Sequence, residues 1–167
     1  MADRSRAPRL ARPHFDPSYG ISNDPPEGLS WADVEVKLAA SRNYWVCTTR
    51  TNGAPHSKPV WGVWTDGALW FGTGDNSVAG RNLVRDPRIS VHLESGDDTV
   101  ILEGTVERFA LSDVPRAAQD AYAAKYAMAT EDAGDDNSPW FSLRPTVALT
   151  WLETDFVKSA ARWEFDD

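Results

Sequence analysis

The chain has one cysteine among its 167 residues, so no disulfide bond can form within it. Cys47 lies between Val46 and Thr48 in an apolar stretch, where a free thiol is typically buried and inert. A chain without an internal disulfide suits a reducing compartment, and we therefore expect the protein in the cytoplasm.

Long apolar runs are missing as well. No stretch approaches the roughly eighteen uninterrupted apolar residues that a membrane-spanning helix needs. The N-terminal segment MADRSRAPRLARPHFDPSYG has basic residues but no apolar core behind them, unlike a secretory signal. We therefore expect no membrane partner.

Basic side chains are fewer than acidic ones, 17 against 25, which gives a net charge of −8. Phosphate backbones repel such a chain, so we do not expect nucleic acid as a partner. This net charge still allows a local basic pocket for a small anionic ligand.

The sequence also lacks the motifs of several enzyme classes. Strand and helix patterns do not alternate along the chain, which excludes a Rossmann fold. No Ser-His-Asp set or Cys/His cluster appears, so neither a catalytic triad nor a metal site is predicted. The acidic segment at residues 129–138 does not have the spacing of a calcium-binding loop, and it is predicted to be a solvated loop.

A β-meander is the strongest local pattern. The predicted strands span residues 44–50, 55–64 and 68–73, and a short helix follows at 77–85. The dipeptides Asn52-Gly53 and Asp66-Gly67 favour type I′ turns between these strands. Pro59 removes a hydrogen-bond donor from the second strand, so it is expected at an edge, at a bulge or where a ligand replaces a neighbouring strand.

The rest of the chain adds three strands and two helices. The strands are predicted at residues 88–94, 99–110 and 146–157, and the helices at 30–42 and 112–129. Ser30 is expected to cap the first helix, and Gly104 to mark a bulge in a long strand. Residues 1–29 contain five prolines and are predicted to be an extended or flexible tail, whereas residues 30–167 form one β-barrel domain.

Four segments, in this order, resemble the split β-barrel flavin and deazaflavin oxidoreductases. They are GAPHSKPVWGVW, WFGTGDNSVAGRNLVRDPR, SVHLESGDDTVILEGTVE and ARWEF. This is the family of pyridoxamine 5′-phosphate oxidase and its actinobacterial relatives that use coenzyme F420. The resemblance implies a mainly β fold with α-helices, namely a split antiparallel barrel of the FMN-binding type with helices outside it.

The resemblance also implies a homodimer with two cofactor sites at the subunit interface. In this family the SKPVW strand passes beside the cofactor ring, and its basic residue, here Lys58, reaches towards the phosphate. The loop after the third strand contributes hydroxyl groups. The implied cofactor-binding residues are Lys58, Pro59, Val60, Trp61, Thr73, Gly74, Ser77, Arg81, Asn82 and Trp163.

One departure from the family pattern bears on the cofactor. Val78 and Ala79 stand where the family has a basic pair, and Arg81, one helical turn beyond Ser77, is the candidate substitute. The resemblance favours coenzyme F420, with FMN as the second choice. The missing cations and the eight tryptophans leave a third alternative, a non-catalytic protein that binds haem or another planar ligand.

The activity implied by the resemblance is hydride transfer between a deazaflavin and a small organic substrate. His56 alternates with Lys58 along one strand, so both side chains are expected on the same face. An imidazole at that place is a candidate proton donor to the product.

Overall fold

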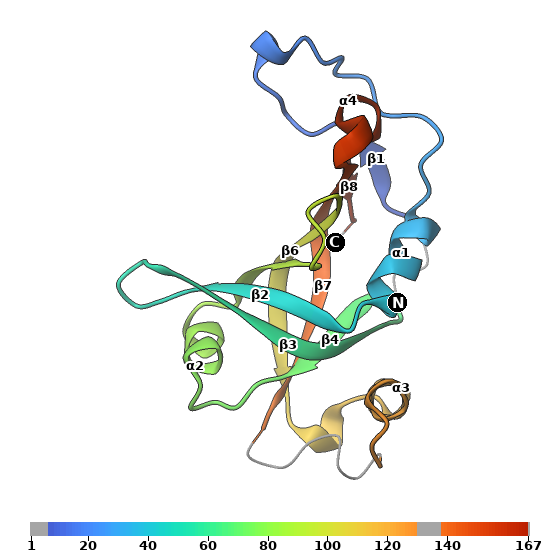
Figure 1. Cartoon of the computed structure of the whole chain (residues 1–167). Helices are drawn as coiled ribbons and strands as arrows, with labels where there is room; N and C mark the ends of the chain where they lie inside the picture. The colour runs from blue at the N-terminus through green and yellow to red at the C-terminus, as the bar shows by residue number, and fades with distance from the viewer. Residues whose placement is uncertain (1–6, 130–137, 167) are drawn as a thin grey trace.

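The computed structural model describes residues 7–129 and 138–166, and eight strands of these residues form one antiparallel sheet (Figure 1). The strands are Arg9–Ala11 (β1), Asn43–Thr49 (β2), Pro55–Thr65 (β3), Ala68–Gly72 (β4), Arg88–His92 (β5), Asp98–Phe109 (β6), Trp140–Leu152 (β7) and Ala161–Glu164 (β8). The helices are Trp31–Ala40 (α1), Val78–Arg85 (α2), Arg116–Tyr126 (α3) and Phe156–Ser159 (α4). The acidic segment predicted as a loop lies almost entirely outside these residues.

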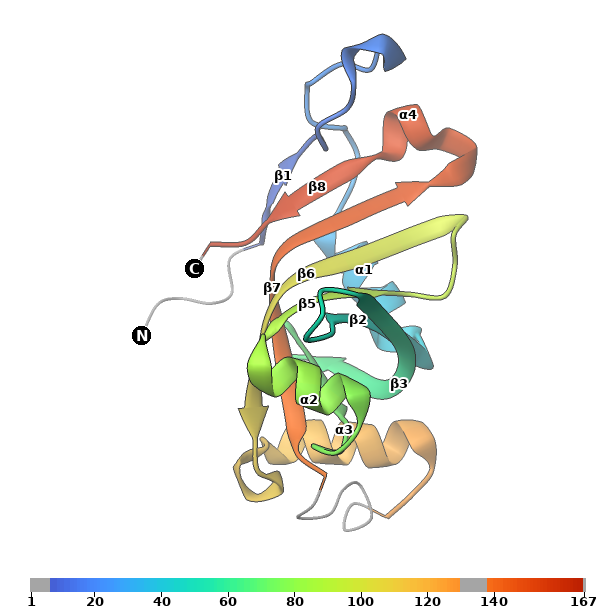
Figure 2. The ribbon, with the colours of Figure 1, turned by 90° about the vertical axis from the view of Figure 1, so that its left-hand side faces the viewer.

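Six of the described strands close into a barrel in the order β7, β4, β3, β2, β5 and β6, and β6 pairs back onto β7. The predicted split antiparallel barrel of about six strands with flanking helices is therefore confirmed. The long strand β7 pairs with β4 near its start, over residues 140–143, and with β8 near its end, over residues 147–150. Beyond the barrel, β8 and β1 extend the sheet towards α4 (Figure 2).

The barrel interior is filled by the inward faces of the strands and closed by α1. Side chains on β2, such as Tyr44 and Val46, are fully shielded from solvent. From α1, Trp31, Val34 and Leu38 pack against this core, each with burial that contributes about 1.5–3 kcal/mol. A second apolar cluster, which includes Trp70 and Trp140, lies under α3 at the opposite end from α4 (Figure 1).

The two predicted turns differ in outcome. Asp66 and Gly67 have φ values of 51° and 67°, as the predicted type I′ turn requires. At the first turn only Gly53 has a positive φ, 82°, and the amide of Gly53 closes the turn on the carbonyl of Arg50. The type I′ prediction for Asn52-Gly53 is therefore wrong, because the connection is longer than two residues.

Three other predictions need correction. The last long strand begins at Trp140, not at residue 146, because β7 continues through Pro145. It ends at Leu152, not at residue 157. The short strands β1 and β8 were not predicted. The side chain of Ser30 makes no capping hydrogen bond, although Ser30 does precede α1.

The bulge predicted at Gly104 is present. The register between β6 and β7 shifts between Glu103 and Gly104, so that Thr146 of β7 is the extra residue opposite them. A Cβ on Gly104 would lie 2.9 Å from the carbonyl oxygen of Arg144. This close approach explains why glycine occupies the position.

Candidate functional site

The candidate site is built around β3, which has two differently paired halves. Residues 55–61 pair with β2, while residues 62–65 pair with β4. Within the part of the chain that the structure describes, the first half therefore has no strand on its other side. Pro59 lies in this half, so the prediction that it marks a sheet edge is confirmed.

Lys58 begins a chain of polar contacts that crosses from β3 to the start of α2. Its Nζ donates to Thr73 Oγ1 at 3.3 Å, and that hydroxyl lies 2.9 Å from Ser77 Oγ. Ser77 precedes α2 and its Oγ accepts a hydrogen bond from the amide of Gly80 at 3.0 Å. Three residues named from the sequence are thus brought into one cluster.

The charge of this cluster suits an anion. Among the described residues, no carboxylate lies within ion-pair distance of Lys58, although Asp75 and Asp86 nearby in sequence pair with Arg108 and Arg88. The start of α2 adds the partial positive charge of free backbone amides. A phosphate group would find a cation, hydroxyl donors and a helix N-terminus in the same place.

His56 lies on the same strand face as Lys58, as predicted from the alternation along β3. The guanidinium of Arg50 lies 3.2 Å from His56 Nδ1. A guanidinium can only donate, so Nδ1 is the acceptor and the neutral ring carries its hydrogen on Nε2. That Nε2 is shielded from solvent and has no hydrogen-bond partner among the described residues.

The pKa of His56 is lowered, first by burial and then by the positive charges of Arg50 and Lys58. The imidazole is therefore neutral at pH 7, with an unused N–H group beside the Lys58 cluster. This arrangement suits a hydrogen bond to an acceptor atom of a ligand better than donation of a full proton.

Three more of the predicted residues shape the loop rather than line the cluster. Arg81 Nη1 donates to the carbonyl of Asn76, which turns the side chain back onto the loop. Asn82 is buried and donates to Thr48 Oγ1 at 2.9 Å, so it ties α2 to β2. A Cβ on Gly80 would lie only 2.3 Å from the carbonyl oxygen of Gly74, so the loop packs directly on the helix backbone.

The remaining predicted residues point elsewhere. Val60 is buried in the barrel core, and Trp163 is buried against Trp31 with its Nε1 donating to Thr150 Oγ1 at 2.9 Å. Pro59 and Trp61 project from the opposite face of β3, where both are exposed. The structure therefore divides the named residues between the inner cluster, the core and the outer face of the sheet.

The outer face carries an aromatic group that sequence reasoning missed. Trp61, which is 41% exposed, stacks on Tyr126 of α3, and the guanidinium of Arg42 lies 5.5 Å from the Trp61 ring centroid. On the same face, His92 stacks on Trp45, and its Nδ1 bonds locally to the carbonyl of Leu93. Tyr126 lies far from Trp61 in sequence, so no local pattern indicates their contact.

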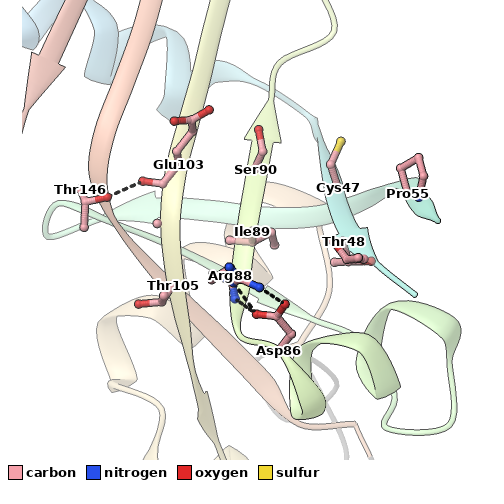
Figure 3. Close-up of a pocket in the computed structure, with 12 residues that line it drawn as sticks. Cys47, Thr48, Pro55, Asp86, Arg88, Ile89, Ser90, Glu103, Thr105 and Thr146 are labelled. Atoms are coloured by element: carbon pink, nitrogen blue, oxygen red, sulfur yellow. Dashed lines mark hydrogen bonds and ion pairs between the residues drawn. The ribbon is translucent and has the colours of Figure 1, made fainter. Parts of the chain in front are cut away.

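A separate hollow of about 680 Å³ lies over β2, β5 and β6 (Figure 3). Its lining includes Cys47, Ser90 and Glu103 together with the ion pair of Arg88 and Asp86. Hydrogen bonds from Arg88 hold the pKa of the Asp86 carboxyl at about 2. None of the cofactor-binding residues named from the sequence lines this hollow.

Cys47 corrects a prediction. Its side chain is half-buried on the outward face of β2, with Sγ 3.3 Å from Ser57 Oγ, rather than buried in the core. The inward positions of the strand are taken by its neighbours Val46 and Thr48.

No described helix is long and apolar enough to cross a membrane.

Comparisons with solved structures agree on the fold. A conserved hypothetical protein from Mycobacterium tuberculosis is 23% identical, with a TM-score of 0.65 over 75% of this chain and 86% of the other. A heme binding protein from Mycobacterium smegmatis is 26% identical, with a TM-score of 0.61 over 74% of this chain, which spans 55% of that protein. An F420 reductase is 19% identical, with a TM-score of 0.54 over 67% and 93% of the two chains.

No curated protein sequence matches the chain. The sequence pattern of one family does match it, over residues 32–157, a range that runs from the start of α1 to α4 and contains the whole barrel and the Lys58 cluster. The chain belongs to the pyridoxamine 5′-phosphate oxidase family.

Proposed function

We propose that the protein is an oxidoreductase that binds coenzyme F420 at the Lys58 cluster and transfers a hydride between this deazaflavin and a small organic substrate. The observation that carries the proposal is the continuous set of contacts from Lys58 through Thr73 and Ser77 to the amide of Gly80. This set offers a phosphate one cation and several donors, and none of the described carboxylates lies within ion-pair distance of Lys58.

The residues present fit a phosphorylated cofactor. Lys58, Thr73, Ser77 and the first amides of α2 would hold its phosphate, and the unpartnered Nε2–H of His56 would donate to a further acceptor atom. When bound, a deazaflavin supplies the hydride chemistry. The chain would supply binding and orientation.

The choice of F420 over FMN rests on Val78 and Ala79. These apolar residues replace the basic pair of the family at the start of α2, and Arg81 is engaged by the carbonyl of Asn76. Each charge-assisted hydrogen bond that is lost weakens a phosphate site by roughly 1.5–3 kcal/mol. The missing cations weaken the case for tight FMN binding, and the resemblance to the deazaflavin-using branch favours F420, so FMN is the second choice.

We further propose that two copies of the chain form a homodimer in the cytoplasm, with the cofactor between them. The unpaired edge of residues 55–61 and the exposed Pro59 and Trp61 beside it support this arrangement. A cofactor ring placed along that edge would contact Pro59 and Trp61 on one side and a second subunit on the other.

Haem binding is the alternative from a different class of function. It is favoured by the likeness to the heme binding protein of Mycobacterium smegmatis at 26% identity. His92 bonds to the carbonyl of Leu93 through Nδ1, which leaves Nε2 as the nitrogen that could bind the haem iron. This role would not use the Lys58 cluster.

Parallel titration of the purified protein with coenzyme F420, FMN and haem tests these functions. We expect F420 to bind with a micromolar or lower dissociation constant, measured through its fluorescence, and FMN to bind more weakly. Haem binding that is lost in His92→Ala and kept in Lys58→Ala would support the alternative. Failure of both F420 and FMN to bind would overturn the proposed activity.

A further inference from the structure

Lys125, on α3, reaches into the end of the barrel instead of extending into solvent. Its Nζ lies 3.0 Å from Tyr44 Oη and 3.0 Å from the carbonyl oxygen of Gly62. It also lies 4.8 Å from the ring centroid of Tyr44 and 5.7 Å from that of Tyr126. The amine thus lies among two aromatic rings and two neutral oxygen atoms, and the Lys125 side chain stays partly exposed to solvent.

No negative charge compensates this amine in the described part of the chain. Its hydrogen-bond partners are a phenol and a carbonyl, and none of the ion pairs formed by described residues includes it. The positive charge of Arg42 acts on it, since that guanidinium lies against the same Tyr126 ring. A like charge and partial burial both favour the neutral form of a lysine.

The two phenols beside Lys125 add no negative charge, although their ring faces and the two hydrogen bonds that the amine donates favour its ammonium form. The pKa of Tyr44 is raised, mainly by burial, and that of Tyr126 is also raised by burial, so both phenols stay protonated at neutral pH. The pKa of Lys125 is lowered to about 8, first by burial and then by Arg42. An appreciable fraction of the amine is therefore unprotonated under physiological conditions.

We propose that Lys125 is a nucleophilic amine and a site of covalent attachment for small aldehydes. The Nζ lone pair attacks the carbonyl carbon, a C–N bond forms, and the carbonyl oxygen leaves as water with the two amine hydrogens. The product is an imine, and no oxidant or reductant is needed. The inference does not depend on which cofactor the Lys58 cluster binds.

The chain provides its own controls, because it has only four lysines: Lys37, Lys58, Lys125 and Lys158. Lys37 pairs with Asp98 at 2.5 Å, and Lys158 is exposed on α4. Both serve as comparison sites for the rate of labelling. Each can be followed separately by mass spectrometry of its own peptide after one labelling reaction.

The experiment is brief treatment of the full-length protein with acetaldehyde and cyanoborohydride at several pH values, where the reductant traps the imine. We expect Lys125 to be alkylated about tenfold faster than Lys158 at pH 7.5, with half-maximal reactivity near pH 8. Equal or slower labelling of Lys125 than of Lys158 or Lys37 would overturn the proposal, whether the cause is an ordinary pKa or a lack of access.

Two variants sharpen the result. Arg42→Gln removes the neighbouring positive charge, so the pH profile of Lys125 should move to higher pH while that of Lys158 stays in place. Lys125→Arg keeps a cation with donors for Tyr44 and Gly62, and it should abolish labelling at position 125 alone. A Lys125 profile that Arg42→Gln leaves unchanged would contradict the proposed role of the neighbouring positive charge.

Discussion

The indole ring of Trp61 lies parallel to the phenol ring of Tyr126, with 4.4 Å between the ring centroids and 5° between the ring planes. The Tyr126 hydroxyl also forms hydrogen bonds with the backbone. It accepts from the amide of Gly62 at 2.8 Å and lies 2.7 Å from the carbonyl oxygen of Arg42. α3 therefore contacts β3 at Gly62, where the pairing of β3 changes from β2 to β4.

Tyr126→Phe should destabilise the protein while it keeps the ring stack. The variant leaves the buried amide of Gly62 without its partner, which costs about 1–3 kcal/mol in the free energy of unfolding. Urea unfolding followed by tryptophan fluorescence measures the change. Tyr122→Phe is the matched control, since no hydrogen bond of the Tyr122 hydroxyl joins it to the rest of the described structure. Equal losses in both variants would show that the Gly62 contact is not responsible.

Lys58→Ala should weaken cofactor binding by about tenfold or more, which corresponds to roughly 1.4 kcal/mol, because it removes the cation of the cluster. Lys58→Arg should retain more affinity than Lys58→Ala. Fluorescence titration with F420 gives the dissociation constants. Lys158→Ala, which removes an exposed lysine from α4, serves as control. Unchanged affinity in Lys58→Ala would place the phosphate elsewhere.

Gly80→Ala should disturb the loop that presents Thr73 and Ser77. Alanine normally favours a helix over glycine by about 1 kcal/mol, but here its Cβ would lie 2.3 Å from the carbonyl oxygen of Gly74. We expect a net loss of stability of about 1–3 kcal/mol and weaker cofactor binding. Thermal unfolding and titration test both effects. Gly72→Ala is the comparison, because nothing lies within 4 Å of its added Cβ, and a stabilised Gly80→Ala would refute the clash.

Lys125 should make stability depend on pH in the alkaline range. Its pKa is about 8 in the folded protein and near 10.5 when exposed, so the unfolded chain binds more protons between these values. The contribution of Lys125 to the free energy of unfolding therefore rises from pH 8 towards pH 10. Above that range the raised pKa of Tyr122, about 12, acts in the opposite direction.

The difference in unfolding free energy between wild type and Lys125→Gln isolates this contribution. It should shift in favour of the wild type as the pH rises from 8 to 10 and stay nearly constant from pH 6 to 7. A difference independent of pH throughout would mean that Lys125 titrates normally. Lys158→Gln, at an exposed position, should show no such trend.

Local sequence signals predicted most of the barrel because the signals themselves are local. Asp66-Gly67 specifies its own turn, and Gly104 marks the bulge that its missing side chain permits. The prediction failed where long-range pairing decides the outcome. Pro145 would end an isolated strand, but the bulge at Thr146 lets β7 continue past it.

The candidate site was likewise predicted where the contacts are local and missed where they are long-range. Thr73 and Ser77 come together because only three residues separate them in the short loop between β4 and α2, and the family pattern added Lys58. By contrast, Trp163 was named from the family pattern but packs beside Trp31 in the core. No local sequence pattern indicated a role for Lys125, because the residues around it come from β2, β3 and the segment just before β2.

The pairing of β7 with both β4 and β6 has a consequence for the order of assembly. Residues 7–129 contain all the barrel strands except β7. Without β7, no strand joins the edge of β4 to the edge of β6. During synthesis on the ribosome, the cylinder can close only after residue 152 has emerged. A nascent chain halted before β7 would expose two unpaired edges, and chaperones would have to shield them from other chains.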